Sequence, residues 1–585
     1  MRSHNNIIQR KRLLGGHVYM TRGRIIGGIF LLLVIMGLVF LFKPEPVVDR
    51  SDLDLPRAVQ MKNPQAAPLD MAFAPANPFA ADGVNPLPHG DPAQQDATPI
   101  PGPLDKTRRL EAEELRYQFL GPGYFGAFTS GVYPDGRRVL WANGVNGIYK
   151  LDYESYEILD HFPTAKAKKY TQAWAEKISA KLDKNNSGSA LLTAMKALWP
   201  LKSLSGVYAM VGVNNWFYFA NKDGSIVAYG DAIDGDAGSK IVEKARFQLP
   251  FNTAGASVGM NITYDGWIVF PTEQGHLIAV SQDLTTHHSV RLSHADSEDI
   301  STHGTGYGWV RNSIAIDDEG GIYVASRNHM HKVVWTGERL STDAADGAWS
   351  ARYRNGTGEG TGATPSLMGF GGEDRFVVLT DGDIRMNLVL MWRDAIPAGW
   401  QTLEGAPSNR IAGQAPVDMG ALDVQAIQSE QTVIVAGYGA FAVNNTPRNP
   451  PWYMPKSGVG RGVTIGPLGS NPEFQPYGIQ KFEWNPRRKR LEQAWVNETI
   501  SSPNGVPWVS TGSGQVYFIG ARENEWTLEA VNWLTGEPTF HYIIGGQTYN
   551  SLFSGPTIDE KGRVFVGTQF GRLRIDPKRE TVDAP

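Results

Sequence analysis

A strand pattern that recurs between residues 117 and 577 constrains the fold of this 585-residue chain more than any other feature. In each copy, a polar or Gly-Asp turn leads into an alternating aromatic and β-branched run, which crosses a glycine turn into a second apolar run. Clear copies begin at Tyr133, Thr263 and Ile558. Such repeats indicate stacked supersecondary units, because one unit cannot bury both of its faces alone. The pattern predicts an all-β fold of the β-propeller type.

The spacing of the turns indicates how many units the chain holds. Turns that contain glycine or aspartate recur near residues 135, 215, 265, 318, 376, 432, 514 and 561. Most intervals are about 50 to 60 residues, which suits one four-stranded blade each. We therefore predict a propeller of seven or eight blades over residues 106–585.

Composition excludes several classes of site and partner. The formal net charge is −4, so no bulk field favours nucleic acid, and we expect no nucleic-acid partner. The chain has no cysteine, which excludes disulfides, thiolate metal sites and a cysteine nucleophile.

The N-terminus has the pattern of a membrane anchor. Residues 1–24 form a basic tail, and the run Ile25–Phe42 is uninterruptedly apolar and long enough to span a bilayer core of about 30 Å. No acidic residue precedes Glu45, so the positive-inside rule places the N-terminus in the cytoplasm. A cleaved signal peptide is the alternative, but no small-residue cleavage site follows the run. We predict a transmembrane signal anchor of a single-pass protein in a bacterial-type inner membrane, with an extracytoplasmic (periplasmic) C-terminal domain.

Residues 43–105 are rich in Pro, Ala, Asp and Asn. This composition buries too little apolar surface to offset the entropy of ordering. We therefore predict a disordered, partly extended tether that holds the domain off the membrane. The alternative is that Met71–Ala80 docks onto a partner or onto the propeller.

Residues 165–199 interrupt the strand pattern with two helical periods. Trp174, Ile178 and Leu182 share one face of the first. After an Asn-Asn-Ser-Gly break, one face of the second carries Leu191, Leu192, Met195 and Leu198. We predict an inserted helical hairpin. Its remaining surface is rich in lysine, which indicates either a solvated face or a contact for a partner or for anionic headgroups, with Lys168 and Lys169 as candidate residues.

A second interruption, residues 444–478, is a long Gly/Pro-rich loop. Loops of this length in a compact domain are usually functional or disordered. Trp452, Tyr453 and Phe474 argue against simple disorder. We predict that the loop folds over one face of the propeller as a lid or partner surface, with Trp452 and Tyr453 as partner-binding residues.

Histidines and carboxylates gather between residues 287 and 331. Histidine and carboxylate are suitable ligands for zinc or iron, but no pair has helical i,i+4 spacing. His329 and His331 alternate with Met330 near a predicted strand, so they share a face. We predict polar loop residues over most of this segment rather than a metal site. The full set is His287, His288, His294, Asp296, Glu298, Asp299, His303, His329 and His331.

Two strand beginnings suggest a possible ligand site. Pro503-Asn504-Gly505 precedes one strand, and Asn312 begins the segment Arg311–Ser326. Both resemble blade motifs of the gluconolactonase-like, calcium-dependent hydrolase propellers. The resemblance implies one calcium in the central channel with Asn312 and Asn504 as ligands, and amide and carboxylate oxygens suit this cation. Asp423, at another inner-strand beginning, is a candidate charged ligand. Such a calcium would polarise the carbonyl of a lactone or ester.

A second resemblance concerns Leu528–Tyr542, LEAVNWLTGEPTFHY. It resembles the Ala-x-Asp-x-x-Thr-Gly-x-x-x-Trp docking motif of the eight-bladed quinoprotein-like propellers, with Asn532 at the Asp position and Phe540 near the Trp position. In that group, the Thr-Gly turn and the aromatic residue tie neighbouring blades together. The vicinal cysteine pair of its alcohol dehydrogenases is impossible here, which argues against pyrroloquinoline quinone as a cofactor.

Three functions remain open from the sequence. The tether, the long insertions and the absence of a convincing catalytic set favour a membrane-anchored propeller that binds a protein partner or ligand as a scaffold or assembly factor. The first alternative is a calcium-dependent lactonase or esterase, and the second is a quinone-dependent oxidoreductase. Whether the chain is an enzyme is left open.

Overall fold

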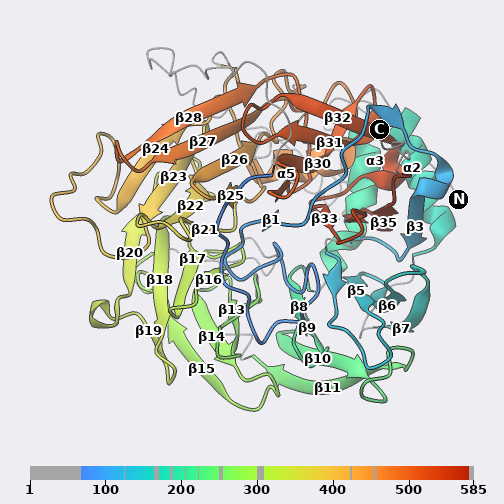
Figure 1. Cartoon of the computed structure of the whole chain (residues 1–585), viewed down its shortest axis with the longest axis horizontal. Coiled ribbons are helices and arrows are strands. Elements are labelled where there is room, and N and C mark those ends of the chain that lie inside the picture. Colours follow the sequence, from blue (N-terminus) through green and yellow to red (C-terminus); the bar gives the residue numbers. More distant parts are fainter. Residues whose placement is uncertain are drawn as a thin grey trace, which may run out of the picture.

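The computed structural model describes residues 68–578, except 124–125, 164–169, 185–188, 205, 222, 250–254, 299–307, 422–423, 452–453 and 455–457. Eight β-sheets form among these residues, and Figure 1 shows them arranged in a ring. This is the all-β, propeller-type arrangement that the repeats predicted. No helix of the described part is long and apolar enough to cross a membrane, and Ile25–Phe42 lies outside that part.

The first four sheets follow one another along the chain. Sheet 1 contains β4 (Phe128–Thr129), β5 (Val139–Gly144), β6 (Gly147–Asp152) and β7 (Ile158–Phe162). Sheet 2 contains β8 (Ala209–Val211), β9 (Phe217–Ala220), β10 (Ser225–Asp231) and β11 (Ile241–Gln248). Sheet 3 contains β12 (Asn261–Ile262), β13 (Ile268–Pro271), β14 (His276–Val280) and β15 (His287–Arg291). Sheet 4 contains β16 (Ala315–Ile316), β17 (Gly321–Ala325), β18 (His329–Trp335), β19 (Leu340–Ser341) and β20 (Trp349–Arg352).

The other four sheets complete the ring. Sheet 5 contains β21 (Ser366–Met368), β22 (Phe376–Thr380), β23 (Asn387–Trp392) and β24 (Ile411–Pro416). Sheet 6 contains β25 (Ile434–Ala436), β26 (Gly439–Val443), β27 (Ile479–Asn485) and β28 (Arg490–Asn497). Sheet 7 contains β29 (Trp508–Ser510), β30 (Gln515–Arg522), β31 (Glu525–Asn532) and β32 (Pro538–Gly545), flanked by β1 (Ala97–Thr98) and β2 (Arg108–Arg109). Sheet 8 contains β33 (Thr557–Ile558), β34 (Val564–Thr568), β35 (Gly571–Ile575) and, from the N-terminal side of the domain, β3 (Leu115–Phe119).

The hydrophobic core lies between the sheets. Each pair of neighbouring sheets shares one apolar cluster, and sheet 8 shares one with sheet 1 through Phe565. Middle strands such as β22, FVVLT, are therefore buried on both faces, whereas the outer strand β11 is buried in part. This explains why the repeats read as apolar runs followed by polar ones. The ring closes where β3 pairs with β35.

The prediction of a disordered tether is wrong for residues 68–105, and the domain begins before residue 106. In Figure 1 this blue segment crosses the centre of the ring. We name residues 68–98 the channel segment. Backbone amides of inner strands in six sheets donate to its carbonyls at 2.7–3.1 Å. The donors are Thr129, Val211, Ile316, Leu367, Val435, Val509 and Thr511, and the acceptors are Asn85, Pro86, Pro92, Ala93, Gln95, Asp96 and Thr98.

The physical reason for this order is hydrogen bonding at strand edges. The innermost strand of each sheet has an unpaired edge, and the channel segment supplies acceptors there. Proline lacks an N–H group but retains its carbonyl, so a proline-rich sequence suits this role. The alternative that Met71–Ala80 docks onto the propeller is confirmed: Asn77 donates to the carbonyl of Ile262 at 3.2 Å, and Tyr264 donates to that of Pro75 at 2.8 Å.

The predicted helical hairpin is present as α2 (Gln172–Lys184) and α3 (Ser189–Leu198), followed by the 3-10 turn η2 (Trp199–Ser203). In α2, Ile178 and Leu182 are buried as predicted. In α3 the predicted apolar face is exposed at Leu192 and Met195, and the buried face carries Ala190, Ala194 and Ala197 instead. Small side chains allow α3 to approach α2 and α5 (Gly458–Leu468) closely. The remaining 3-10 turns are η1 (Ala112–Glu114), η3 (Ala344–Asp346) and η4 (Gln547–Tyr549).

These helices define the two faces of the ring. Because strand direction alternates within each sheet, the connections between second and third strands and between successive sheets lie on one face. This face carries α2, α3 and α5, and we name it the helical face. The opposite face carries the turns between first and second strands and between third and fourth strands. The predicted folding of residues 444–478 over one face is confirmed for α5, which joins a cluster with α2 and α3.

Cations in the third strands tie several sheets to the next one. Lys150 is fully buried and its Nζ lies 2.6 Å from Asp231 Oδ1 and 2.5 Å from the carbonyl oxygen of Ser239, both in sheet 2. Tyr133 donates to the other oxygen of Asp231 at 2.8 Å. Equivalent cations reach the turn between third and fourth strands of the next sheet from β18, β27 and β35: Lys332, Lys481 and Arg574.

The predicted docking motif ties sheets 6 and 7, but with a different aromatic residue. Asn532 Oδ1 accepts from the amide of Thr535 at 3.1 Å, the turn-holding part expected of the Asp position. The indole of Trp495, in sheet 6, donates to the carbonyl of Trp533 at 3.0 Å and lies against Gly536. Phe540 packs beside Tyr542 in the apolar cluster that sheets 7 and 8 share. The turn of sheet 7 is thus held by an aromatic residue of the preceding sheet, whereas Phe540 holds the corresponding outer-strand position between sheets 7 and 8.

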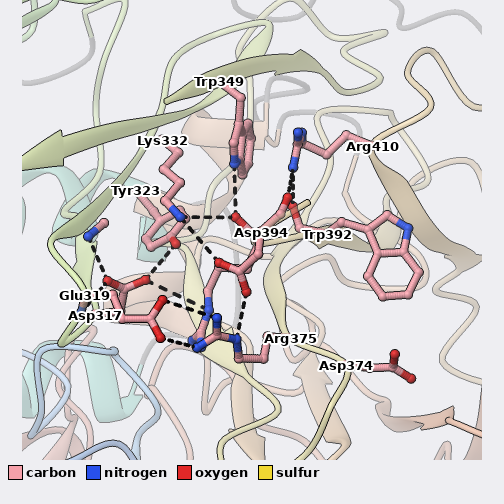
Figure 2. Close-up of polar contacts among 12 residues, drawn as sticks. Asp317, Glu319, Tyr323, Lys332, Trp349, Asp374, Arg375, Trp392, Asp394 and Arg410 are labelled. Atoms are coloured by element: carbon pink, nitrogen blue, oxygen red, sulfur yellow. Dashed lines mark hydrogen bonds and ion pairs between the residues drawn. The ribbon is translucent and has the colours of Figure 1, made fainter. Parts of the chain in front are cut away.

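Figure 2 shows a related junction between sheets 4 and 5. Trp349 donates to the carbonyl of Arg393 at 3.0 Å. Arg375 forms ion pairs with Glu319 and with Asp394, both at 2.7 Å. Two outer-strand tryptophans, Trp495 and Trp349, thus each donate to a carbonyl in the corresponding turn of the following sheet.

Candidate functional site

Asn312 and Asn504, the two predicted site residues that the structure describes, both precede first strands and so lie on the helical face. There α5 lies over loops that connect sheets 6, 7 and 8. The carbonyl of Gly466 accepts from the side-chain amides of Asn504 at 2.5 Å and Asn550 at 2.8 Å. The last four carbonyls of a helix lack partners inside the helix, so these two amides cap the C-terminus of α5.

The structure therefore places the predicted metal ligands in separate hydrogen-bond networks. The Asn504 side chain is buried, and its oxygen accepts from Ser551 at 2.9 Å. Asn312 donates to the carbonyl of Thr361 at 2.9 Å, and Asp423 lies outside the described residues. Within the described part of the chain, no three His, Cys, Asp or Glu side chains form a group that could hold a metal. Calcium binding by this set stays a prediction.

The four predicted partner-binding residues are not described by the structure. Trp452 and Tyr453 precede α5, and Lys168 and Lys169 precede α2, in the ranges set aside above. The segments that carry them nevertheless end at helices of one and the same face. The sequence missed Asn550, the second cap of α5, because no local motif surrounds it.

A small pocket lies beside α5 between the loops of sheets 4, 5 and 6. The Arg311 guanidinium forms a bidentate pair with Glu430 at 3.1 and 3.3 Å. Burial raises the pKa of the adjacent Asp381 to about 7, and the Asn387 side chain donates to it. The glycine-rich loop 356–362 contributes Gly360 and Gly362 to its lining. The pocket holds about 10 Å³, which is room for roughly one water, so it is no preformed substrate site.

A histidine cluster lies nearby in sheet 4. The rings of His294 and His329 stack at 4.1 Å, and His329 Nδ1 is 3.0 Å from Glu298. His331 contacts the hydroxyls of Ser326 at 2.9 Å and Ser350 at 3.1 Å. Burial, with repulsion from neighbouring histidines, lowers the pKa of His329 to about 4 and that of His331 to about 3.

The predicted shared face of His329 and His331 is confirmed, since their rings lie 5.9 Å apart. The prediction of loop residues is wrong for His287 and His288. Both belong to β15, where His288 packs edge-on against Trp335 at 5.3 Å. The alternating pattern around them is too short to identify a strand by periodicity alone.

The histidines predict a measurable pH dependence. Both pKa values are lower in the folded state than the ordinary 6.5, so below pH 6.5 the unfolded chain binds more protons and unfolding is favoured. Between pH 6.5 and 4, His331 is expected to remove on the order of 3 kcal/mol from the free energy of unfolding. Urea unfolding of the native chain and of His331→Gln across this range measures the difference.

The variant is needed for this comparison because other groups change the free energy of unfolding in the opposite direction over the same pH range. Burial raises the pKa of Asp91 and of Asp381 to about 7, so both contribute stability as the pH falls from 7 toward 4. These contributions are common to both proteins and cancel in the difference. Parallel pH profiles for the two proteins would contradict the assignment to His331.

The channel segment brings a buried acid–base group to the centre of the ring. His89 Nδ1 lies 2.8 Å from Asp96 Oδ2. Burial raises the pKa of Asp96 as well as that of Asp91. His89, Gln94 and Asp96 have positive φ angles of 62°, 59° and 52°. The sequence missed these residues because they lie in the segment that it assigned to the tether.

Exposed apolar side chains gather at two places. On the helical face, Leu192, Met195 and Trp199 are 63%, 60% and 64% exposed. On the opposite face, neighbouring turns of sheets 1 and 2 expose Val132, Val213 and Ile233, which we name the turn patch. The turns touch, because the amide of Gly131 donates to Asn215 at 2.8 Å and Gly235 lies against Pro134.

The fold has counterparts among solved structures, although no family model matches the chain. The quinohemoprotein alcohol dehydrogenase of Comamonas testosteroni is similar over 85% of this chain and 81% of its own, with 12% identity and a TM-score of 0.47. A europium-containing methanol dehydrogenase is similar over 85% of this chain and 90% of its own, with 10% identity and a TM-score of 0.45. A streptogramin B lyase has 12% identity over 79% of this chain and 96% of its own, with a TM-score of 0.34.

A relationship by sequence spans nearly the whole chain. An uncharacterized protein of Archaeoglobus fulgidus is 31% identical over 577 residues, which cover 94% of this chain and 97% of that protein. The chain therefore belongs to the same family as this Archaeoglobus fulgidus protein.

Proposed function

We propose that the chain is an eight-bladed propeller anchored by Ile25–Phe42, whose extracytoplasmic domain binds a protein partner as a scaffold or assembly factor. The observation that supports this proposal is the filled channel. Carbonyls of the channel segment accept hydrogen bonds from the inner strands of six sheets, and α5 is capped over the helical side by Asn504 and Asn550. Because the channel is occupied by the chain itself, a partner would bind to an outer surface of the ring.

The turn patch is the surface that we assign to the partner. Val132, Val213 and Ile233 are 51%, 55% and 65% exposed. Adjacent exposed apolar side chains often mark a protein interaction site. The turns that carry them are fixed in place, since Tyr133 donates to Asp231 and the amide of Val213 donates to the carbonyl of Phe79 at 2.9 Å. A rigid apolar surface of this kind loses little entropy when a partner binds.

Photo-crosslinking in the native host tests the assignment. p-Benzoylphenylalanine placed at Val132, Val213 or Ile233 of the full chain is expected to capture the same protein at all three positions. Leu534 is the matched control, because it is 43% exposed in an equivalent turn of sheet 7 and is expected to capture no such protein. The proposal is contradicted if no position yields a shared partner while the purified chain hydrolyses lactones or oxidises alcohols with a quinone acceptor.

A further inference from the structure

The outer face of α3 and η2 carries an apolar stripe that the fold does not cover. Leu192, Met195 and Trp199 follow one another at i, i+3 and i+7, so they lie along one side of the helix. The opposite side of α3 is buried against α2 and α5 through its alanines. Burying these three large side chains would require another molecule, since nothing in the described chain contacts their outer side closely enough to shield them.

Exposed lysines lie on α3 and η2 themselves and on the adjacent helix α2. Lys196 is exposed on α3, and Lys202 Nζ lies 3.4 Å from the ring centroid of Trp199. The adjacent α2 exposes three further lysines, Lys177, Lys181 and Lys184. The exposed acid of α2 is Glu176, whereas Asp183 is half-buried and accepts from the amide of Gln547 at 2.9 Å. Together α2, α3 and η2 expose five lysines and one acid, although the whole chain has a net charge of −4.

We propose that α3 and η2 rest on the surface of an anionic lipid bilayer. Helices that lie in the bilayer interface combine Leu, Met or Trp on one side with lysine around it, and tryptophan favours the headgroup level. Each lysine near an anionic leaflet contributes a further attraction. Charge complementarity and side-chain type together favour lipid over a protein partner.

The chain geometry allows this contact together with the predicted anchor. Residues 43–67 separate Ile25–Phe42 from the first described residue and, fully extended, span up to about 80 Å. This length is enough to pass beside the domain, because the channel segment begins at the opposite face, where the amide of Leu69 donates to the carbonyl of Thr511 at 2.8 Å. With the helical face on the membrane, the turn patch would point away from it.

A single fluorescent label can test the contact, because the chain has no cysteine. Met195→Cys in the full chain is labelled with an environment-sensitive dye and reconstituted in vesicles of phosphatidylcholine alone or with 30% phosphatidylglycerol. We expect the emission to shift to shorter wavelength, with quenching by doxyl-labelled lipid, in the anionic vesicles. Ile233→Cys on the opposite face is the matched control and is expected to stay in water.

Charge reversal gives the second arm. Lys181→Glu with Lys196→Glu is expected to weaken the contact by about fivefold per lysine removed, which raises the phosphatidylglycerol content needed for the shift. A label at residue 195 that stays water-exposed in both vesicles overturns the inference. So does a label that becomes shielded only when a protein from the native membrane is added. Crosslinking at the turn patch does not depend on either result, so failure of this inference is distinguishable from failure of the scaffold proposal.

Discussion

Removal of the channel segment from the full chain is expected to prevent the domain from reaching a stable fold. Seven inner-strand amides would lose their acceptors. A buried group left without a partner costs about 1–3 kcal/mol, so the sum is roughly 7 to 20 kcal/mol, against about 5–15 kcal/mol for the stability of a typical domain. Water that enters the channel would replace some of these bonds but not the contacts of Leu87 and Ala93, which are fully buried.

Circular dichroism during heating and limited proteolysis measure the effect. The control is deletion of residues 43–67, which leaves every described contact in place and is expected to melt like the native chain. A synthetic peptide of residues 68–98, added during refolding of the deleted chain, is expected to restore protease resistance. If the chain without residues 68–98 unfolds cooperatively at the native temperature, the segment is dispensable and the argument fails.

Replacing Lys150 by Met is expected to lower the free energy of unfolding by about 3–5 kcal/mol, the usual cost of breaking a buried ion pair by removing one partner. The variant leaves Asp231 only 5% exposed and without its cation. Tyr133 would still donate to this carboxylate, but one neutral hydrogen bond does not compensate a buried charge. Urea unfolding monitored by tryptophan fluorescence measures the change.

Two further variants separate the charge from the packing. Lys150→Met with Asp231→Asn removes the unpaired charge and is expected to recover much of the loss. Lys244→Met breaks a pair at 2.7 Å whose Asp234 is 86% exposed, and a surface pair of this kind is worth about 1 kcal/mol or less. Equal effects of Lys150→Met and Lys244→Met would show that the buried pair has no special role.

The sequence predicted those parts of the fold that local patterns encode. Alternating apolar runs around Tyr133, Thr263 and Ile558 all became strands of the ring, since side-chain alternation reports directly on a two-sided sheet. The 3.6-residue period around Ile178 and Leu182 became α2. Each of these signals arises within about twenty residues, where burial follows from sequence spacing.

The parts that could not be predicted depend on partners far away in the sequence. The channel segment is ordered by carbonyls such as those of Pro92 and Ala93, which accept from Ile316 and Leu367. The amino-acid composition of the channel segment does not reveal these long-range hydrogen bonds. Asn504 was correctly placed where an inner strand begins, but a local motif cannot show that α5 would occupy its amide. The buried side of α3 was missed because close helix contact favours alanine over leucine there.

Ring closure by β3 also fixes the order in which the molecule can be completed. The strand Leu115–Phe119 pairs with β35, Gly571–Ile575, which is synthesised hundreds of residues later. The channel segment likewise needs inner strands that are synthesised up to Val509 and Thr511. The channel segment and β3 therefore lack these partners until the later strands have been synthesised. During that time, the sheets that have already formed expose unpaired edges. Closure of the ring is thus expected to be a late folding step, which follows the synthesis of β35.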